Sequence, residues 1–475
     1  MDALAARLAR LVAHPTIAAA DPAATDPAPF EGLHATLRAL YPLLFERCEV
    51  IRVGAHGLLL RWAASGSLSL PKGLRQAQPT EAQPAGLRQA QSAGLRQAQP
   101  AEAGALVLMA HQDVVPVAGQ DWTGDPFTAR EVDGQLIGRG TLDDKGMLLV
   151  ICEAVEALLG RGFEPARDVW VLLGDDEEVG GATARAAADL LRGRGVRPWL
   201  VLDEGGAVVE AGVLPGVDRP AAMIAVAEKG IATLRLTTTD AGGHASTPHR
   251  RGATARIARA VVRLERRPFP ARLGGITREM IATLGSHAHG PLRELYARVI
   301  PLSPVFARLL VALGPETAAI ARTTMAVTQL SGSPASNVLA TRAEAVVNVR
   351  LDTDTRVADA VAHVRRAIAD RSITVAVEGA SEASRVSRTD DDRWALLVRL
   401  VDEVFPDAVA APYVQNGATD SRRFSPWCDH VYRFAPLRMS DADRARIHAA
   451  DEQVAVATLG EGVRFITRLI EEACS

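Results

Sequence analysis

Histidine and carboxylate residues gather at four points of the chain, each near the end of an apolar run. The first point is His111-Gln112-Asp113, which follows residues 105–110. Because side chains two positions apart in an extended chain face the same side, His111 could bind a metal ion while Asp113 orients its ring. The other three points are Asp143-Asp144 between glycines, the acidic run at 175–178, and Asp203-Glu204.

The acidic run and a distant histidine indicate a cation. Four successive acids at 175–178 repel one another unless something positive compensates them. His448 adds an imidazole to the candidate ligands. Such ligands suit zinc, with manganese or cobalt as alternatives, and two ions about 3.5–4 Å apart could share a carboxylate. Each motif alone is more often chance or a solvated face, but several together at strand ends favour a metal site.

The elements that carry these residues have the pattern of an α/β sheet. Apolar runs at 105–110, 168–173 and 199–202 are typical of buried strands, and residues 147–159 and 182–192 have helical spacing. The alternation of such strands with helices predicts an α/β sheet. Open sheets of this class bind ligands at the carboxyl ends of their strands, which is where the acidic points fall.

From residue 230 the pattern changes. Strands are expected at 231–238, 323–329 and 344–351, with helices at 253–264 and near 357–370. This β-α-β-β-α-β-like order, with a helical insertion near 277–321, predicts a second domain. We therefore expect a discontinuous catalytic domain, residues 1–228 and 386–475, with residues 229–385 inserted into it.

One segment has the composition of a low-complexity insertion. The heptad GLRQAQP begins at residue 73, and close copies begin at 86 and 94. The spacing is unequal and large apolar side chains are almost absent, so a stacked repeat is not expected. We interpret residues 73–104 as a disordered insertion between two strands, with a partner-binding arm as the alternative.

Composition excludes several classes of protein. The 475 residues include 53 Lys and Arg and 56 Asp and Glu, which gives a formal net charge of -3. Because there is no excess of positive charge, nucleic acid is not an expected partner. The four cysteines form no CxxC pair, which favours reduced thiols over disulfides or a cysteine zinc site. No run approaches the roughly 18 apolar residues of a membrane span, and the first residues do not resemble a signal peptide. We expect a cytoplasmic protein that does not associate with membranes.

Longer motifs carry a family resemblance. In chain order they are AHQDVVPV, GRGTLDDKG, GDDEEVGG, LDEGG, GGHASTP, NVLA followed by NVR, GATDSRRF and RIHAADE. Together they resemble the di-zinc metallopeptidase family of aminoacylases, carboxypeptidase S and cytosolic dipeptidases, and most closely the carboxypeptidase S branch. The resemblance covers essentially the whole chain outside 73–104. It implies a catalytic domain with a mixed, largely parallel sheet flanked by helices, and an inserted α+β, ferredoxin-like lid or dimerisation domain.

The resemblance also implies roles for the residues of the metal site. His111 and Asp203 would bind one zinc ion, Glu178 and His448 would bind the other, and Asp143 would bridge both. Asp113 would support His111, and Glu177 would be the general base that takes a proton from water and returns it to the leaving amine.

Further residues are implied in substrate binding. His244 would reach the substrate of a neighbouring subunit in a homodimer, and Asn337 and Arg350 would contact the substrate. Gly417, Ala418 and Thr419 would line the same pocket. Arg350 as a structural ion-pair partner remains an alternative. The implied activity is hydrolysis of dipeptides, C-terminal peptide bonds or N-acyl amino acids; the alternative is a non-catalytic binding protein on the same scaffold.

Overall fold

A large mixed sheet forms the centre of the computed structural model, which describes residues 2–65 and 104–475. Its strands are β1 (Glu49–Val53), β2 (Gly57–Trp62), β3 (Ala105–His111), β6 (Val169–Gly174), β7 (Pro198–Asp203), β8 (Val208–Val209), β9 (Ala221–Glu228), β16 (Val409–Gln415), β17 (Val431–Arg433) and β18 (Arg438–Met439). They lie in the order β1-β2-β6-β3-β7-β17-β9-β8-β18, with β16 beside β9. The neighbours β6, β3, β7 and β17 are parallel, whereas β1 and β2 form an antiparallel edge. The expected mixed, largely parallel sheet is confirmed.

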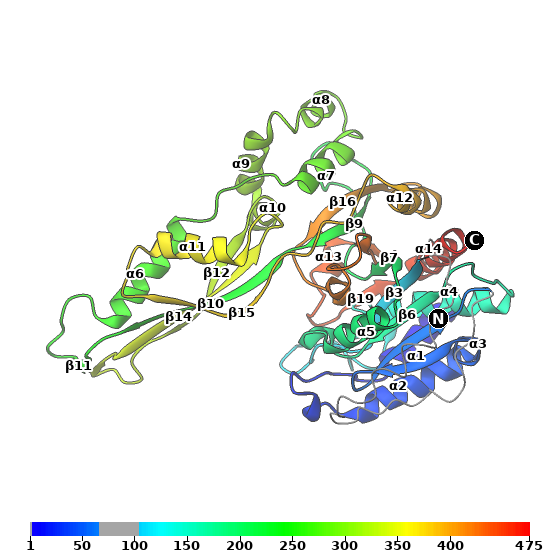
Figure 1. Ribbon diagram of the computed structural model, residues 1–475, viewed down its shortest axis with the longest axis horizontal. Coiled ribbons are helices and arrows are strands. Elements are labelled where there is room, and N and C mark those ends of the chain that lie inside the picture. The colour runs from blue at the N-terminus through cyan, green and yellow to red at the C-terminus, as the bar shows by residue number, and fades with distance from the viewer. Residues whose placement is uncertain (1, 66–103) are drawn as a thin grey trace, which may run out of the picture.

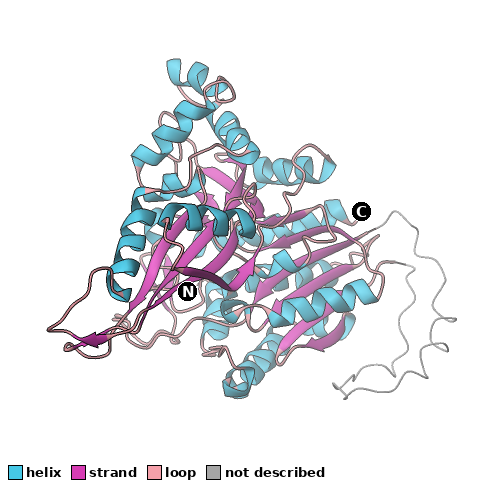
Figure 2. Cartoon of the chain, turned by 60° about the vertical axis from the view of Figure 1, so that its left-hand side comes forward, coloured by secondary structure: helices cyan, strands magenta, loops and turns pink. Residues whose placement is uncertain are grey.

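Alternating side chains of β3 divide the core into two layers. Leu106, Leu108 and Ala110 pack into one cluster, and Val107 and Met109 pack into the other. The first cluster is covered by α1 (Ala3–Val12), α2 (Pro27–Leu40), α3 (Pro42–Arg47), α4 (Lys145–Gly160), α12 (Asp392–Val404) and α14 (Val456–Ala473). The second is covered by α5 (Ala182–Gly193). Because apolar side chains leave both faces of β3, the strand is buried along its whole length. Figure 2 shows helices packed along the strands of the large sheet.

A second, antiparallel sheet extends away from the first (Figure 1). It consists of β10 (Gly230–Thr239), β12 (Thr324–Ser331), β14 (Arg342–Leu351) and β15 (Thr374–Ser381), in the order β12-β14-β10-β15. The helices α6 (Ala253–Arg266) and α11 (Val357–Ile368) pack on it through one apolar cluster. The chain order β10-α6-β12-β14-α11-β15 confirms the ferredoxin-like expectation. We call these four strands and two helices the lid.

The helical insertion between α6 and β12 packs elsewhere. It comprises α7 (Gly275–Gly285), α8 (Pro291–Ala297), α9 (Ser303–Leu313) and α10 (Pro315–Ile320). Met280, Ile281 and Leu284 of α7 share an apolar cluster with Val409 and Ala411 of β16. This part of the inserted segment therefore rests on the large sheet and not on the lid sheet. The domain boundaries expected from the sequence stay a prediction.

A small sheet pairs a segment near the C-terminus with residues 130–137. It consists of β4 (Arg130–Val132), β5 (Gln135–Ile137) and β19 (Gln453–Ala455), in the order β19-β5-β4. Because Gln453 pairs with Ile137, the residues just before β19 lie beside those just after β5. The described chain also contains short elements: η1 (Pro22–Ala24), η3 (Glu177–Val179), β11 (Gly243–His244), β13 (Val338–Leu339), η4 (Asp420–Arg423) and α13 (Asp441–Arg444).

The insertion, the helices and the cysteines also bear on the sequence expectations. The expected insertion at 73–104 lies, up to residue 103, outside the described residues. Over the part that is described, none of the helices is both long and apolar enough to span a bilayer. All four cysteines are free and buried.

Candidate metal centre

The parallel strands bring the predicted site residues to one edge of the large sheet. His111 is the last residue of β3, the acidic run follows β6, and Asp203 is the last residue of β7. Because β6, β3 and β7 are adjacent and parallel, their carboxyl ends meet. The position of the candidate site is therefore a consequence of strand order.

Two imidazoles and two carboxylates converge at this edge. His111 Nε2 lies 3.0 Å from Asp143 Oδ1, and His448 Nε2 lies 3.0 Å from Asp143 Oδ2. His448 Nε2 is also 3.1 Å from Glu178 Oε1. The ligand atoms of His111, Asp143 and Glu178 all lie within 4.8 Å of one another. Asp143 thus presents one oxygen to each histidine, the arrangement expected of a carboxylate shared by two cations.

Asp113 holds two parts of the site together. His111 Nδ1 lies 3.0 Å from the backbone oxygen of Asp113 and 3.3 Å from its carboxylate. The same carboxylate accepts hydrogen bonds from the backbone amides of Glu177 (3.2 Å) and Glu178 (3.0 Å). Asp113 is fully buried, so one side chain orients both the imidazole and the turn that carries Glu177.

The electrostatics of the protein groups fit a cationic occupant. Burial raises the pKa of Glu177 well above its ordinary value; the nearby charge of His111 opposes this, and Asp420 and Asp143 add to it. Hydrogen bonds to Asp143 and Glu178 raise the pKa of His448 to about 10. Burial acts to raise the pKa of Asp143, but the two histidines outweigh it and lower that pKa. Positive charge nearby stabilises the acids of this site, and the mixed imidazole and carboxylate set suits zinc or a similar divalent ion.

Asp203 stands apart from the compact set. Its Oδ2 accepts a hydrogen bond from the Ser421 amide at 2.7 Å, and its side chain is buried. Burial raises its pKa, while the hydrogen bonds from Ser421 and Thr419 oppose that shift. Asp203 is not among the three residues whose ligand atoms cluster. Its role as a metal ligand stays a prediction.

Glu452 is a functional residue for which the sequence suggested no role. Its carboxylate accepts hydrogen bonds from the amides of Gly140 (3.0 Å), Leu142 (2.8 Å) and Asp143 (3.0 Å). It also pairs with Arg139 at 2.7 Å, and both side chains are buried. Glu452 therefore holds the loop that presents the shared carboxylate. The sequence could have indicated a role for Glu452, because it belongs to the same RIHAADE motif as His448.

The loop that carries His448 is held in an uncommon conformation. His448 has φ of 63° and Asp451 has φ of 54°, a region that residues other than glycine seldom adopt. The side chain of Gln120 donates to the His448 carbonyl at 2.8 Å, and Thr123 donates to the Asp451 carboxylate. These contacts hold the backbone where the His448 side chain, which is about half exposed (51%), reaches Asp143.

The structure divides the predicted substrate residues between the two ends of the lid. His244 lies in β11, which pairs with β13, and Asn337 accepts a hydrogen bond from Ala245 at 3.0 Å. Both side chains are exposed at the tip of the lid, on the far side from the large sheet (Figure 1). Arg350 pairs with Ile231 at the other end of β10. Since β10 continues for eight more residues to Thr239, the two ends are roughly 25 Å apart.

Arg350 shows no sign of a structural ion pair. Among the described residues, no acidic side chain forms a salt bridge with it. Burial lowers the pKa of Arg350, and the nearby charge of Arg422 lowers it further. A half-buried guanidinium without an acidic partner remains available to a carboxylate of a substrate.

The residues expected to line a substrate pocket differ in their surroundings. The amide and hydroxyl of Thr419 both donate to Glu228 Oε1, at 3.1 and 2.7 Å. Thr419 is buried and supports Asp203 through Ser421. Its hydroxyl is therefore already used in hydrogen bonds within the protein. Gly417 is exposed.

Known proteins resemble this chain over most of its length. Residues 107–472 match peptidase family M20/M25/M40. A protein of Homo sapiens named N-fatty-acyl-amino acid synthase/hydrolase PM20D1 is 35% identical over 371 residues, covering 77% of this chain and 74% of that one. The probable carboxypeptidase S-like 2 of Dictyostelium discoideum is 32% identical over 370 residues, covering 77% and 71%.

Solved structures show the same fold at low identity. The M20 family metallo-carboxypeptidase Sso-CP2 from Sulfolobus solfataricus superposes with a TM-score of 0.65 at 15% identity, covering 100% of this chain and 99% of that chain. Human carnosine dipeptidase 1 gives a TM-score of 0.62 at 16% identity, covering 99% and 96%.

Proposed function

The chain belongs to peptidase family M20/M25/M40, and from this premise we propose that it cleaves an amide bond beside a free carboxylate, with two zinc ions as its cofactors. The substrates would be N-acyl amino acids, dipeptides or peptides with a free C-terminus. The observation that carries this proposal is the position of Asp143 between His111 and His448, with Glu178 beside them. Cobalt or manganese would substitute for zinc, because the donor set is the same.

The protein groups have separate tasks in this reaction. Divalent cations at such a site acidify a water molecule and stabilise negative charge on a substrate oxygen. Glu177 would take the proton of that water on its carboxylate and later deliver it to the leaving nitrogen. Asp113 keeps Glu177 in place through the backbone hydrogen bond at 3.2 Å. His111, Asp143, Glu178 and His448 would hold the cations, and Asp203 would complete the set.

Arg350 would recognise the substrate carboxylate. Its guanidinium has a planar fork that pairs well with a carboxylate, and no acid of the described chain competes for it. Gly417 would leave space beside the substrate. A substrate whose carboxylate is amidated would lose this interaction.

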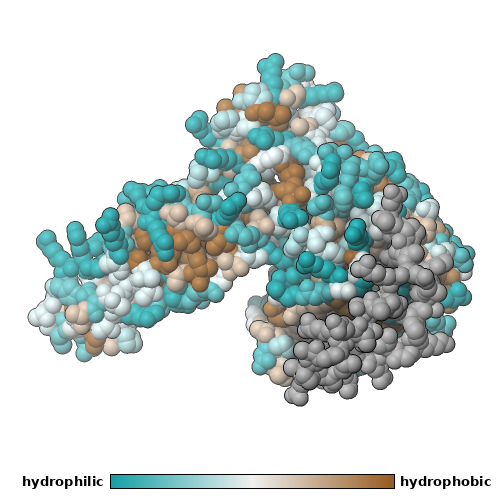
Figure 3. Space-filling view, in the orientation of Figure 1, coloured by the Kyte–Doolittle hydropathy of each residue, from teal (hydrophilic) through white to brown (hydrophobic). Residues whose placement is uncertain are grey.

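We also propose a homodimer in which His244 acts on the partner's substrate. His244 and Asn337 are exposed at the lid tip, about 25 Å from Arg350, so both ends of one lid cannot reach the same small substrate. The lid offers an interface: β12 is an edge strand, and Leu330 on it is 62% exposed. Figure 3 shows apolar side chains gathered in the region of α11 and β12.

The cytoplasm is the location we propose. Four buried, free cysteines support it, because an oxidising compartment favours disulfides. Fractionation of cells that express the full chain would test it; recovery of the protein outside the cytoplasmic fraction would contradict it.

A substrate panel tests the proposed activity. The purified full chain, supplied with zinc, manganese or cobalt, is incubated with N-acyl amino acids of short and long acyl chain, dipeptides, and their C-terminally amidated counterparts. We expect metal-dependent release of free amino acid from the carboxylate forms and little from the amides. A chain that carries metal yet hydrolyses no member of the panel would contradict the proposal. The fatty-acyl name of the human relative makes long-chain N-acyl amino acids the first substrates to test.

A further inference from the structure

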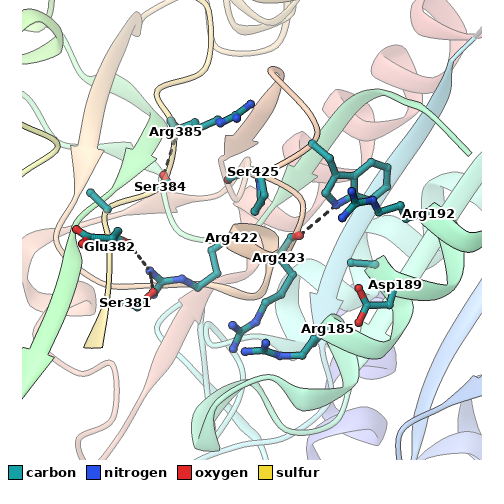
Figure 4. A pocket seen from close by; sticks show the side chains of 14 residues that line it. Arg185, Asp189, Arg192, Ser381, Glu382, Ser384, Arg385, Arg422, Arg423 and Ser425 are labelled. Carbon is teal, nitrogen blue, oxygen red and sulfur yellow. Dashed lines mark hydrogen bonds between the residues drawn. The ribbon is translucent and has the colours of Figure 1, made fainter. Parts of the chain in front are cut away.

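A cavity of about 480 Å³ lies beside the segment that leaves the lid. Its walls come from α5, from residues 381–385 at the end of β15, and from residues 422–427 (Figure 4). None of His111, Asp143, Glu178, Asp203 and His448 is among its lining residues. The cavity is therefore a separate feature of the fold.

The cavity carries an excess of positive charge. Its lining residues include two acids, Asp189 and Glu382, and five arginines: Arg185, Arg192, Arg385, Arg422 and Arg423. The Glu382 carboxylate accepts hydrogen bonds from the Val357 amide, at 3.1 and 3.2 Å. The side chains of Arg185 and Arg423 point toward one another in Figure 4.

The arginines are poorly neutralised by the protein. Arg423 donates to the Gly180 carbonyl at 2.6 Å, and its Nε is buried without a partner. Within the described part of the chain, Arg185 and Arg192 form no ion pair. Arg422 donates to Ser381 Oγ at 2.8 Å and lies 3.9 Å from a Glu228 oxygen. Arg385 lies 3.8 Å from the exposed Asp429.

Repulsion between the arginine side chains adds to the effect of the excess positive charge. Burial lowers the pKa of Arg423, the charges of Arg185 and Arg422 lower it further, and the charges of Asp420 and Asp176 oppose this shift. Like charges held together around a cavity are unfavourable unless an anion offsets them. Several guanidinium groups converging on one volume make a donor set that matches the oxygens of a phosphate.

We propose that this cavity binds a small dianion of the phosphate type, either free phosphate or a phosphate ester. Its volume is within the usual range for small-molecule sites, and Trp427 adds an aromatic wall on which an ester's organic part could pack. A carboxylate with a single charge would leave most of the positive excess uncompensated. The site does not depend on the proposed hydrolase activity.

The bound anion would connect the exit of the lid to the support of the metal centre. Arg422 and Arg423 belong to η4, which also contains Ser421, the hydrogen-bond donor to Asp203. Ser381 is the last residue of the lid strand β15, Glu382 follows it, and Arg422 already donates to both. A dianion held between η4 and α5, by Arg423 and Arg185, would therefore lie beside the contact that ties the segment leaving the lid to the catalytic sheet.

Calorimetric titration tests the site. The full, metal-loaded chain is titrated with inorganic phosphate and, in a second arm, with glycerol phosphate, at constant ionic strength. We expect saturable binding of at least one of them, weakened by about tenfold or more in a variant with both Arg185→Gln and Arg423→Gln. The exposed Arg308→Gln on α9 is the matched control and should bind as the unmodified chain does. Tighter binding in one arm identifies free phosphate or the ester as the better ligand.

A variant of the metal centre separates this site from phosphate held by the cations. His448→Ala disturbs the metal centre and leaves every lining residue of the cavity intact. We expect it to bind phosphate normally. Absence of binding by the unmodified chain would overturn the proposal, and so would binding lost in His448→Ala but kept in the double arginine variant. Circular dichroism of each variant verifies that the chain is folded.

Discussion

At the scale of residues, neighbouring carboxylates are given different tasks by their hydrogen bonds. Glu177 and Glu178 are consecutive in η3, and Asp113 accepts the amides of both. Yet only Glu178 contacts His448, at 3.1 Å, and only Glu178 belongs to the compact ligand set. Glu177 is left as a partly buried acid close to the site but outside the ligands, which is what a general base requires.

Glu177→Ala should keep the metal and lose the reaction. Because Glu177 would act on water and not on the cations, we expect bound metal to be unchanged and kcat to fall by about 10²–10⁴-fold. Elemental analysis and initial rates on a cleaved substrate measure the two effects. Glu178→Ala is the control and should lose metal. Near-normal turnover by Glu177→Ala would refute the assignment.

Glu452→Gln should weaken metal binding. The amide would place a donor where the carboxylate now accepts from Arg139 and from three loop amides, so Asp143 would lose its fixed position. Residues that support ligands typically contribute about 10–100-fold to metal affinity, and we expect a loss in that range. Competition with a chromogenic chelator measures it. Glu153→Gln, which breaks the half-exposed pair with Arg7, is the control; equal metal affinities in the two variants would contradict a positioning role.

At the scale of elements, the crossing from the large sheet to the lid is held by a buried ion pair. Strand β9 ends at Glu228 and β10 begins at Gly230. Glu228 Oε1 lies 2.8 Å from Arg433 Nε, with both side chains fully buried, and it also accepts from Thr419. One carboxylate thus joins β9, β17 and the segment before η4, so the lid leaves the sheet at a fixed point.

Arg433→Met should destabilise the fold strongly. Removal of Arg433 leaves the buried Glu228 with the more distant Arg422 (3.9 Å), and breaking a buried ion pair costs about 3–5 kcal/mol of unfolding free energy. Urea denaturation followed by circular dichroism measures it. Arg52→Met, which breaks an exposed pair with Glu31, should cost about 0–1 kcal/mol. A similar small effect for both variants would show that the buried pair is not needed.

At the scale of the whole molecule, the candidate metal centre and the proposed substrate contacts lie in separate parts of the fold. The metal centre belongs to the large sheet, Arg350 to the base of the lid, and His244 to its tip. Because His244 and Arg350 are about 25 Å apart on one lid, a site that uses both requires a second copy of the chain, whereas a site without His244 could close within one chain. The two cases differ in a measurable way.

Mixing two inactive variants distinguishes these cases. His244→Ala and Glu177→Ala are each expected to be nearly inactive. If His244 acts across a dimer, exchange of subunits creates mixed dimers with one complete site, and about a quarter of normal activity should return. Activity that stays at the level of the separate variants would show that His244 acts within its own chain or not at all.

Deletion of residues 66–103 should be tolerated. Trp62 of β2 and Leu106 of β3 both lie opposite Val169 of β6, so the two ends of the excursion are separated by two strand spacings, about 10 Å. A linker of about six residues spans that distance. We expect metal content and turnover within about twofold of the full chain, and a thermal midpoint that is little changed. An inactive or unfolded deletion would show that the segment is part of the working structure.

The sequence by itself determined the local features: the strand ends that carry His111, the acidic run and Asp203, the ferredoxin-like order of the lid, and the family. These follow from the periodicity of apolar residues and from short motifs, both readable within a few residues. Contacts between distant segments were decided only by the tertiary structure. The position of Glu452 against Asp143 depends on the pairing of β19 with β5. The packing of α7 on β16 depends on an apolar cluster assembled from three parts of the chain. The separation of His244 from Arg350 depends on the length of β10 and the direction in which the lid leaves the sheet. Such relations join residues far apart in sequence, and no local pattern encodes which of them will meet.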